Sequence, residues 1–283
     1  MTKTDEINDT AAPLIEHLKE LRNRIIYSLI AFLIGFFVGY MVWKPIFNLL
    51  NHPLCRVLLE RGQPCQLVLI KMQEGFFVAL KIAMWGGFFL AFPFIAYQLW
   101  RFVAPGMYKS EKNAFLPFLV ASPVMFMAGA SFCYFVILPW AFQFFLGFQD
   151  SFKAAVETGT ALSATPAGVV FNGSMEAYLS LTMTFMLAFG LTFQLPVLLT
   201  LMGRAGLISS KGLKATRKYA VVGILAIAAM VTPPDIMSQL ILFAAVYPLY
   251  EISIFLIARF ERQREAKARA DGTWVDLGDE DSA

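Results

Sequence analysis

The chain has 283 residues, of which 58% are hydrophobic and 15% are charged, and its formal net charge is +3. A soluble domain carries about 25% charged residues, so this composition excludes an ordinary water-soluble globular protein. Several apolar stretches reach roughly 18 residues, enough for a helix to cross about 30 Å of hydrocarbon. We therefore expect an all-α integral membrane protein.

A short segment with charges of both signs precedes the first apolar stretch. It is "PLIEHLKELRNRII" (13–26), and its apolar residues recur every third or fourth position at Leu14, Leu18, Leu21 and Ile25. This spacing predicts an amphipathic cytoplasmic helix over about 13–24, with Glu16, Glu20 and Asn23 on another face that meets the cytosol. Because the segment mixes acids and bases and the apolar run is long, we expect the first span to be retained rather than cleaved as a signal peptide.

Six apolar stretches follow one another along the chain. They lie near 25–43, 75–100, 115–145, 178–202, 219–232 and 240–257. The fifth stretch would be only about 21 Å long as a helix, whereas a bilayer core is about 30 Å thick. This mismatch predicts that the fifth span thins the lipid locally or recruits partner helices.

The Lys and Arg residues concentrate on one side of the six predicted spans. They lie mainly in 1–24, 101–112, 204–218 and 259–269. Because basic loops stay on the cytoplasmic side, both termini are expected to be cytoplasmic. We expect a membrane domain over 1–258. Over 259–283 we expect a charged cytoplasmic tail that starts as a frayed helix and continues as disordered chain.

Prolines occur repeatedly in or at the ends of the second to fourth spans, at Pro93, Pro117, Pro123, Pro139 and Pro196. They are expected to bend these helices, and a bundle bent repeatedly forms a cupped surface rather than a straight cylinder. Gln194 lies near the middle of the fourth span, just before Pro196. Its amide either satisfies a backbone group of the kind that proline frees or belongs to a polar patch that receives a partner.

Two ionisable residues inside the predicted spans are informative, because such groups are costly in a membrane. Lys81 follows Glu74 by seven residues, near the same helix face, and its side chain is long enough to snorkel outward. Glu251 is expected to reach interfacial water or an arginine of the tail such as Arg259.

The three cysteines differ in position. Cys133 falls in the third span and is expected to be a small buried apolar residue. Cys55 and Cys65 share the first external loop, where an oxidising compartment would favour a disulfide. Two free or partly buried thiols are the alternative.

Motifs of catalysis and cofactor binding are missing from the sequence. It contains no G-x-x-x-x-G-K-[ST], no H-E-x-x-H and no G-x-S-x-G. His17 and His52 stand apart, so neither a metal site nor a cofactor is expected. The basic residues do not interleave with aromatic ones as in a nucleic-acid-binding surface. An enzyme is therefore not expected.

Three segments together resemble one protein family. They are "PLIEHLKELRNRII" before the first span, "PFIAYQLWRFVAPGMYKSEK" (93–112) after the second and "TPPDIMSQ" (232–239) between the fifth and sixth. In this order within a six-span chain, they resemble the C subunit of the twin-arginine translocase (TatC), over about 13–258. The resemblance implies a cupped, glove-like bundle of six transmembrane helices, which agrees with the bent spans expected above.

The resemblance also implies a function and partners. Proteins of this family recognise signal peptides that carry consecutive arginines, and they assemble with single-span TatA- and TatB-type subunits and with copies of themselves to export folded proteins. Transport is driven by the proton gradient. The implied location is the bacterial inner membrane, with both termini in the cytoplasm, the lipid bilayer as a further partner and no nucleic acid.

The resemblance assigns a recognition role to two acids. Glu20 and Glu111 match the acids that the family uses against the arginine pair, and Arg22, Phe102 and Tyr108 match neighbouring motif positions. Guanidinium groups pair with carboxylates in a planar, two-pronged geometry that lysine cannot copy. Exposed ion pairs contribute only about 0–1 kcal/mol each, whereas micromolar binding needs about 8 kcal/mol. We therefore expect the acids to confer specificity and an apolar groove to supply most of the affinity.

Other residues are implied for partner docking and for shape. Thr232 and Gln239 match polar positions where a partner helix docks. Gln194 occupies a site where many relatives carry glutamate, so this chain keeps hydrogen-bonding capacity there without a titratable group. The expected structural residues are Pro93, Pro196, Pro233, Pro234 and Asp235.

Alternatives stay open for Glu20 and for the whole chain. An i,i+4 ion pair with Arg24, worth about 0.2–0.5 kcal/mol, is a second role for Glu20 that can coexist with recognition. A secondary transporter for a small solute would show repeated halves and ionisable groups near the midplane, but no repeat is evident. A structural scaffold for membrane partners is the third possibility.

Overall fold

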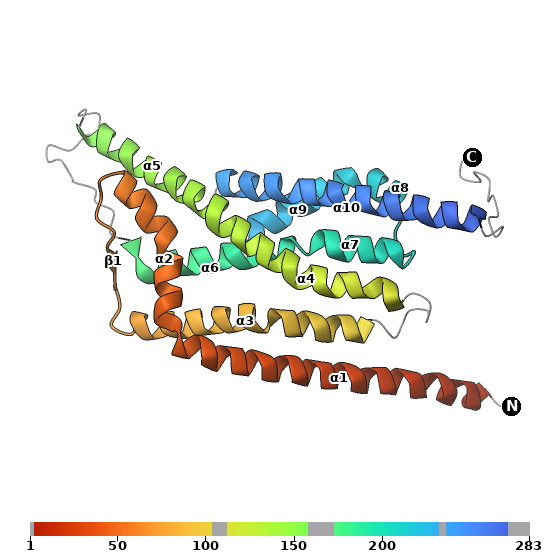
Figure 1. Cartoon of the computed structure of the whole chain (residues 1–283). Helices are drawn as coiled ribbons and strands as arrows, with labels where there is room; N and C mark the ends of the chain where they lie inside the picture. The colour runs from red at the N-terminus through yellow and green to blue at the C-terminus, as the bar shows by residue number, and fades with distance from the viewer. Residues whose placement is uncertain (1–2, 104–111, 158–172, 232–235, 271–283) are drawn as a thin grey trace. The chain divides into compact units, whose positions relative to one another are not determined.

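The computed structural model describes residues 3–103, 112–157, 173–231 and 236–270. The chain forms two compact units, Met1–Gly190 and Leu191–Ala283. The described residues are almost entirely helical (Figure 1). The elements in chain order are α1 (Lys3–Met41), α2 (Trp43–Glu60), β1 (Leu67–Val68), α3 (Glu74–Val103), α4 (Lys112–Phe132), the π-helix η3 (Cys133–Ile137), α5 (Leu138–Glu157), β2 (Gly173–Ser174), α6 (Met175–Thr192), α7 (Leu195–Arg204), α8 (Ser210–Ala215), α9 (Arg217–Val231) and α10 (Ile236–Ala270).

Within the described part of the chain, five helical segments are long and apolar enough to cross a membrane. They are Glu16–Met41, Glu74–Phe102, Phe118–Phe148, Met175–Arg204 and Ile236–Ala266. These segments overlap the predicted spans one, two, three, four and six, which confirms a multi-helix membrane protein. The predicted fifth span corresponds to α9, whose 15 residues extend about 22 Å. Its effect on bilayer thickness, the orientation of the termini and the cupped shape stay predictions.

The predicted amphipathic segment and the predicted first span form one continuous helix, α1. Leu18 and Ile25 of the apolar stripe are 59% and 57% exposed, so the stripe can lie in lipid rather than in a protein core. Glu16 is exposed, but Glu20 is only half-exposed and lies on the side of α1 that faces α3. On the charged face of α1, Glu16 is thus open to solvent, whereas Glu20 lies beside the contact with α3.

Glycines bring the backbones of α1 and α3 together. A Cβ built on Gly35 would lie 2.6 Å from the carbonyl oxygen of Gly87, and one built on Gly87 would lie 2.5 Å from the backbone nitrogen of Phe36. Gly39 has a similar approach, 2.9 Å, to the carbonyl oxygen of Ala83. Small residues at membrane helix contacts permit this close approach. The sequence "GFFVG" (35–39) carries the signal in its G-x-x-x-G spacing.

An aromatic cluster forms much of the interior of the first unit. Phe126 of α4 is fully buried, and its ring stacks on that of Phe92 of α3 with centroids 3.8 Å apart. A Cβ built on Gly190 of α6 would lie 2.7 Å from the Phe126 ring. The absent side chain at 190 therefore leaves room for the Phe126 ring between α3 and α6.

The prolines act on the helices in different ways. Pro93 lies inside α3, which continues unbroken through it. Pro139 follows the π-helix η3, and a wider turn before a proline accommodates the carbonyl that has lost its N–H partner. Pro196 lies in the first turn of α7, just after the helix is interrupted between α6 and α7. Pro233, Pro234 and Asp235 lie outside the described residues, as does Thr232.

The segment before α3 is tied to the segment before α6. β1 and β2 form a short parallel ladder, and the buried carboxylate of Glu74 accepts hydrogen bonds from the backbone N–H groups of Ile70 and Glu176 at 2.6 and 2.8 Å. Lys81 forms an ion pair with Glu176 at 2.7 Å. The charge of Lys81 is therefore paired with Glu176 of α6 and not with Glu74 of its own helix. Glu74 instead binds the backbone at the starts of α3 and α6.

The structure joins Cys55 of α2 to Cys65 by a disulfide, with the two Cα atoms 5.0 Å apart. This arrangement closes the end of α2 onto the segment that leads to β1. Cys133 is buried in η3, as expected for a small apolar residue.

The second unit is held by contacts of α7, α8 and α9 with α10. A Cβ built on Gly203 of α7 would lie 2.7 Å from the Ile257 side chain. Glu261 accepts hydrogen bonds from the backbone and the hydroxyl of Ser210 at the start of α8. Glu251 pairs with Arg217 of α9 at 2.7 Å, so the alternative in which an arginine of the tail such as Arg259 is its partner is wrong. The helix α10 continues well beyond 258, to Ala270.

We expect Gly87→Ala to destabilise the first unit, because the new methyl group would meet the backbone of α1 rather than a side chain that can move. Such overpacking lowers the free energy of unfolding by about 1–3 kcal/mol. Thermal unfolding of the purified protein in detergent measures the loss. Gly75→Ala in the same helix meets nothing within 4 Å and is the matched control. Equal stabilities of the two variants would contradict the close α1–α3 packing.

Candidate recognition site

A small polar network joins α1 to the C-terminal part of α3. Arg24 donates one hydrogen bond to Glu20 at 2.9 Å and another, from its other terminal nitrogen, to the amide oxygen of Gln98 at 3.0 Å. Glu20 and Arg24 are one turn apart on α1, whereas Gln98 is contributed by α3. The guanidinium of Arg24 is therefore held between a carboxylate of its own helix and an amide of the neighbouring one.

Burial is graded across this network. Gln98 is 5% exposed, while the side chains of Arg24 and Glu20 are 17% and 32% exposed. An arginine this far from solvent needs partners, since a buried charge without them is costly. Gln98 and Glu20 supply those partners. The carboxylate is the most accessible member, and no described residue donates a hydrogen bond to its second oxygen.

An aromatic contact lies one turn before Glu20. The ring of His17 stacks on that of Phe102, with centroids 4.4 Å apart and an interplanar angle of 19°. This contact fixes the end of α3 against α1 close to the Glu20 network. His17 therefore has a packing partner in Phe102.

The predicted recognition residues are brought together only in part. The structure places Glu20 and Phe102 on adjoining turns of the α1–α3 contact. Arg22 is exposed and donates a long hydrogen bond of 3.4 Å to its neighbour Asn23. Glu111 and Tyr108 lie outside the described residues, in the stretch between α3 and α4.

The predicted partner-docking residues occur in the second unit. Gln239 of α10 donates a hydrogen bond to the carbonyl oxygen of Leu225 in α9 at 2.9 Å, so it stabilises the α9–α10 contact. Gln194 precedes α7 at the helix interruption and is buried. Its side chain does not cap α7, so the two predicted roles of its amide stay predictions.

Sequence reasoning missed two members of the recognition site. Gln98 is part of the segment "PFIAYQLWRF" (93–102), but its link to Arg24 depends on which faces of α1 and α3 meet. His17 was considered only as an isolated histidine. The i,i+3 spacing of His17 and Glu20 on one helix was the available signal.

The arrangement suits exchange of one guanidinium for another. Glu20 already binds an arginine at hydrogen-bonding distance, and Arg24 has a second acceptor in Gln98 that keeps it in place if the carboxylate turns to a guest. Charge-assisted hydrogen bonds of this type are roughly twice as strong as neutral ones. The described residues contain no group of three or more His, Cys, Asp or Glu side chains that could hold a metal ion.

Similarity to known proteins extends over this region. Residues 16–244 match the family model described as TatC, Sec-independent protein translocase protein. The chain is 40% identical over 265 residues to the Sec-independent protein translocase protein TatC of Magnetococcus marinus, covering 93% of this chain and 91% of that protein. It is 39% identical over 244 residues to the protein of the same name from Aquifex aeolicus, covering 86% and 94%.

Solved structures are similar as well. A crystal structure described as the twin arginine translocase receptor TatC superposes with a TM-score of 0.70 and 38% identity, covering 86% of this chain and 98% of that one. A second, of the same receptor in DDM, gives a TM-score of 0.72 and 37% identity, covering 85% and 98%. The likeness therefore concerns sequence and fold together.

We expect Gln98→Leu to lower the free energy of unfolding by about 1.5–3 kcal/mol, because Arg24 would lose an acceptor for a charged group. Denaturant or thermal unfolding in detergent measures this loss. Gln143→Leu is the control, since the Gln143 side chain is exposed on α5. A Gln98 variant as stable as the control would show that Arg24 does not depend on the amide.

Proposed function

The chain belongs to the TatC family of Sec-independent protein translocases, and from this premise we propose that it is the receptor subunit of a twin-arginine export system. It binds twin-arginine signal peptides of folded cargo at its cytoplasmic face, with Glu20 and Glu111 facing the two arginines. It then nucleates assembly of the translocation complex. The chain is a multi-pass membrane protein, and the proposed location is the bacterial inner membrane with both termini in the cytoplasm.

The contact between Glu20 and Arg24 is the observation that carries this proposal. The carboxylate holds a guanidinium at 2.9 Å in the resting protein, so its environment already permits the pairing that a signal-peptide arginine requires. If the Glu20 carboxylate leaves Arg24, the guanidinium of Arg24 still has Gln98 as an acceptor. It does not then become a buried charge without a partner. A guest arginine then replaces an interaction of the same kind, and the net gain from this exchange is small.

Because the exchange of arginines at Glu20 gains little free energy, most of the affinity for a signal peptide has to come from contacts with its apolar segment. Phe94 and Leu90 precede Gln98 by four and eight residues on α3, so the three residues form one ridge of this helix. Phe94 and Leu90 are 43% and 58% exposed, whereas Gln98 is buried. Leu90 also lines an apolar pocket of about 340 Å³ between α2, α3 and α6, together with Gly86. Gly86 is about 18 Å from Gln98 along the helix.

The distance from Gln98 to the pocket suits an apolar helix that follows an arginine pair. An apolar helical segment that begins next to the arginine pair would reach the pocket after about three turns. Burial of apolar surface at about 25 cal/mol per Å² can supply most of the roughly 8 kcal/mol of micromolar binding. We propose that the ridge and pocket hold the apolar segment while the carboxylates select for arginine.

Assembly with single-span TatA- and TatB-type subunits and with other copies of this chain is part of the proposal. The short α9 and the polar positions Thr232 and Gln239 support a docking place beside α9 and α10, because a helix shorter than the bilayer favours association with partner helices. The proton gradient is the proposed driving force. Gln194 has no titratable group, so protonation at that position is not part of the mechanism.

Photocrosslinking from position 20 tests the receptor function against its alternatives. A photoreactive residue at 20 is expected to crosslink to a twin-arginine signal peptide presented to membranes that contain the full chain. Crosslinks only to neighbouring membrane proteins would indicate a scaffold. Solute uptake by the purified protein in vesicles, without a peptide crosslink, would indicate a small-solute transporter.

We expect Glu20→Gln combined with Glu111→Gln to abolish most of the discrimination between Arg-Arg and Lys-Lys signal peptides. Two ion pairs of about 0–1 kcal/mol each are lost, so binding of the Arg-Arg peptide should weaken by at most about 30-fold and approach that of the Lys-Lys peptide. Fluorescence anisotropy with labelled peptides measures both affinities. Glu16→Gln, one turn earlier and exposed, should retain the preference. Unchanged discrimination in the double variant would remove the carboxylates from the recognition site.

A further inference from the structure

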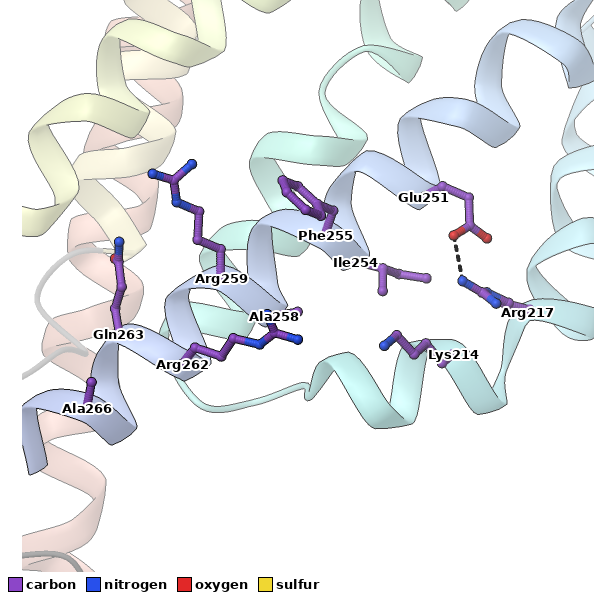
Figure 2. Close-up of a pocket in the computed structure, with 10 residues that line it drawn as sticks. All are labelled: Lys214, Arg217, Glu251, Ile254, Phe255, Ala258, Arg259, Arg262, Gln263 and Ala266. Carbon is purple, nitrogen blue, oxygen red and sulfur yellow. Dashed lines mark hydrogen bonds and ion pairs between the residues drawn. The ribbon is translucent and has the colours of Figure 1, made fainter. Parts of the chain in front are cut away.

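A second pocket lies in the second unit and shares no lining residue with the proposed recognition site. It encloses about 520 Å³ beside α8, the start of α9 and the C-terminal half of α10. Figure 2 shows Lys214 of α8 and Arg262 of α10 extending toward the same space from opposite sides. The pocket is therefore formed where three helices of one compact unit come together.

The lining of this pocket is strongly basic. Arg217, Arg259, Arg262 and Lys214 contribute positive charge, and Glu251 is the acid among the lining residues. Glu251 is already engaged, because it pairs with Arg217 at 2.7 Å and accepts a hydrogen bond from the Tyr247 hydroxyl at 3.0 Å. Lys214, Arg259 and Arg262 form no hydrogen bond or ion pair with the described residues.

Cations gathered in this way repel one another, and the cost falls when an anion lies between them. The ammonium of Lys214 and the guanidinium of Arg262 flank the open space in Figure 2. Both groups are hydrogen-bond donors only and suit phosphate oxygens. The charge pattern thus favours a phosphate-bearing anion as the occupant.

The pocket also has an apolar side that a free phosphate would not need. Phe255 is 67% exposed and Ile254 is buried, and both line the pocket about two turns before Arg262 on α10. This part of α10 lies in the segment Ile236–Ala266, which is long and apolar enough to cross a membrane. The change from apolar to basic side chains along α10 marks the level where a lipid headgroup meets its acyl chains.

We propose that this pocket binds one anionic phospholipid, with its phosphate between Lys214 and Arg262 and an acyl chain along Phe255. Basic pockets between membrane helices on the cytoplasmic side have the chemistry for anionic headgroups. The bound lipid would join α8 to α10 through its phosphate. It would therefore stabilise the second unit independently of signal-peptide binding.

Native mass spectrometry of the delipidated full chain tests the proposal. With dioleoyl-phosphatidylglycerol as the probe, one lipid per chain is expected to bind in preference to dioleoyl-phosphatidylcholine. Each basic residue near an anionic lipid surface changes affinity roughly fivefold, so Lys214→Gln with Arg262→Gln should weaken phosphatidylglycerol binding by about 25-fold. Glycerol 3-phosphate, which carries the headgroup chemistry without acyl chains, should not displace the lipid at equal concentration.

The matched control is Lys211→Gln with Arg264→Gln. It also removes one lysine from α8 and one arginine from α10, but neither residue lines the pocket. The affinity of this control variant for phosphatidylglycerol should stay within about threefold of that of the unsubstituted chain. Thermal unfolding in detergent checks that both variants fold. Equal losses in the two variants would show diffuse attraction to basic charge, and equal binding of both lipids would show no headgroup selectivity. Either result overturns the proposal.

Two further outcomes also overturn the proposal by identifying another occupant. Displacement of phosphatidylglycerol by glycerol 3-phosphate at equal concentration would identify a site for a soluble phosphate. Phosphatidylglycerol binding that appears only after removal of 271–283 would identify the acidic tail as the occupant. That tail carries Asp271, Asp276, Asp279, Glu280 and Asp281.

Discussion

The backbone contact between α1 and α3 is the constraint on which the proposed recognition site depends. Gly35, Gly39 and Gly87 leave no room for a Cβ between the two helices. This closeness sets the register in which Arg24 meets Gln98 and His17 meets Phe102. A wider helix spacing would leave the guanidinium of Arg24 with only its local partner, and Glu20 would then be an ordinary surface carboxylate.

Two ion pairs between described residues join charged side chains from different helices. Lys81 of α3 pairs with Glu176 of α6, and Glu251 of α10 pairs with Arg217 of α9. An ionisable group in or near hydrocarbon is costly without such a partner. The basic pocket beside α8 and α10 differs, because three of its cations lack a partner among the described residues. That difference is what points to a ligand there.

Sequence reasoning succeeded where a local pattern determines the outcome. Apolar runs long enough to span a bilayer predicted the membrane helices, and the three motif segments identified the family. The i,i+4 spacing of Glu20 and Arg24 predicted their ion pair, which the structure contains. Local patterns could not predict the partner of Glu251, because Arg217 comes from a different helix and is 34 residues away. Gln98 was missed for the same reason.

Composition and motif order by themselves determined that this is a helical membrane protein of the TatC family, because span length and family motifs are written in contiguous residues. Tertiary structure alone decided which polar groups lie together: Arg24 bonds to Gln98, Lys81 pairs with Glu176, and Lys214 and Arg262 line one pocket. These pairs depend on the faces that neighbouring helices turn to each other. Those faces are set by glycine contacts and side-chain packing between segments distant in the chain, which no local spacing encodes.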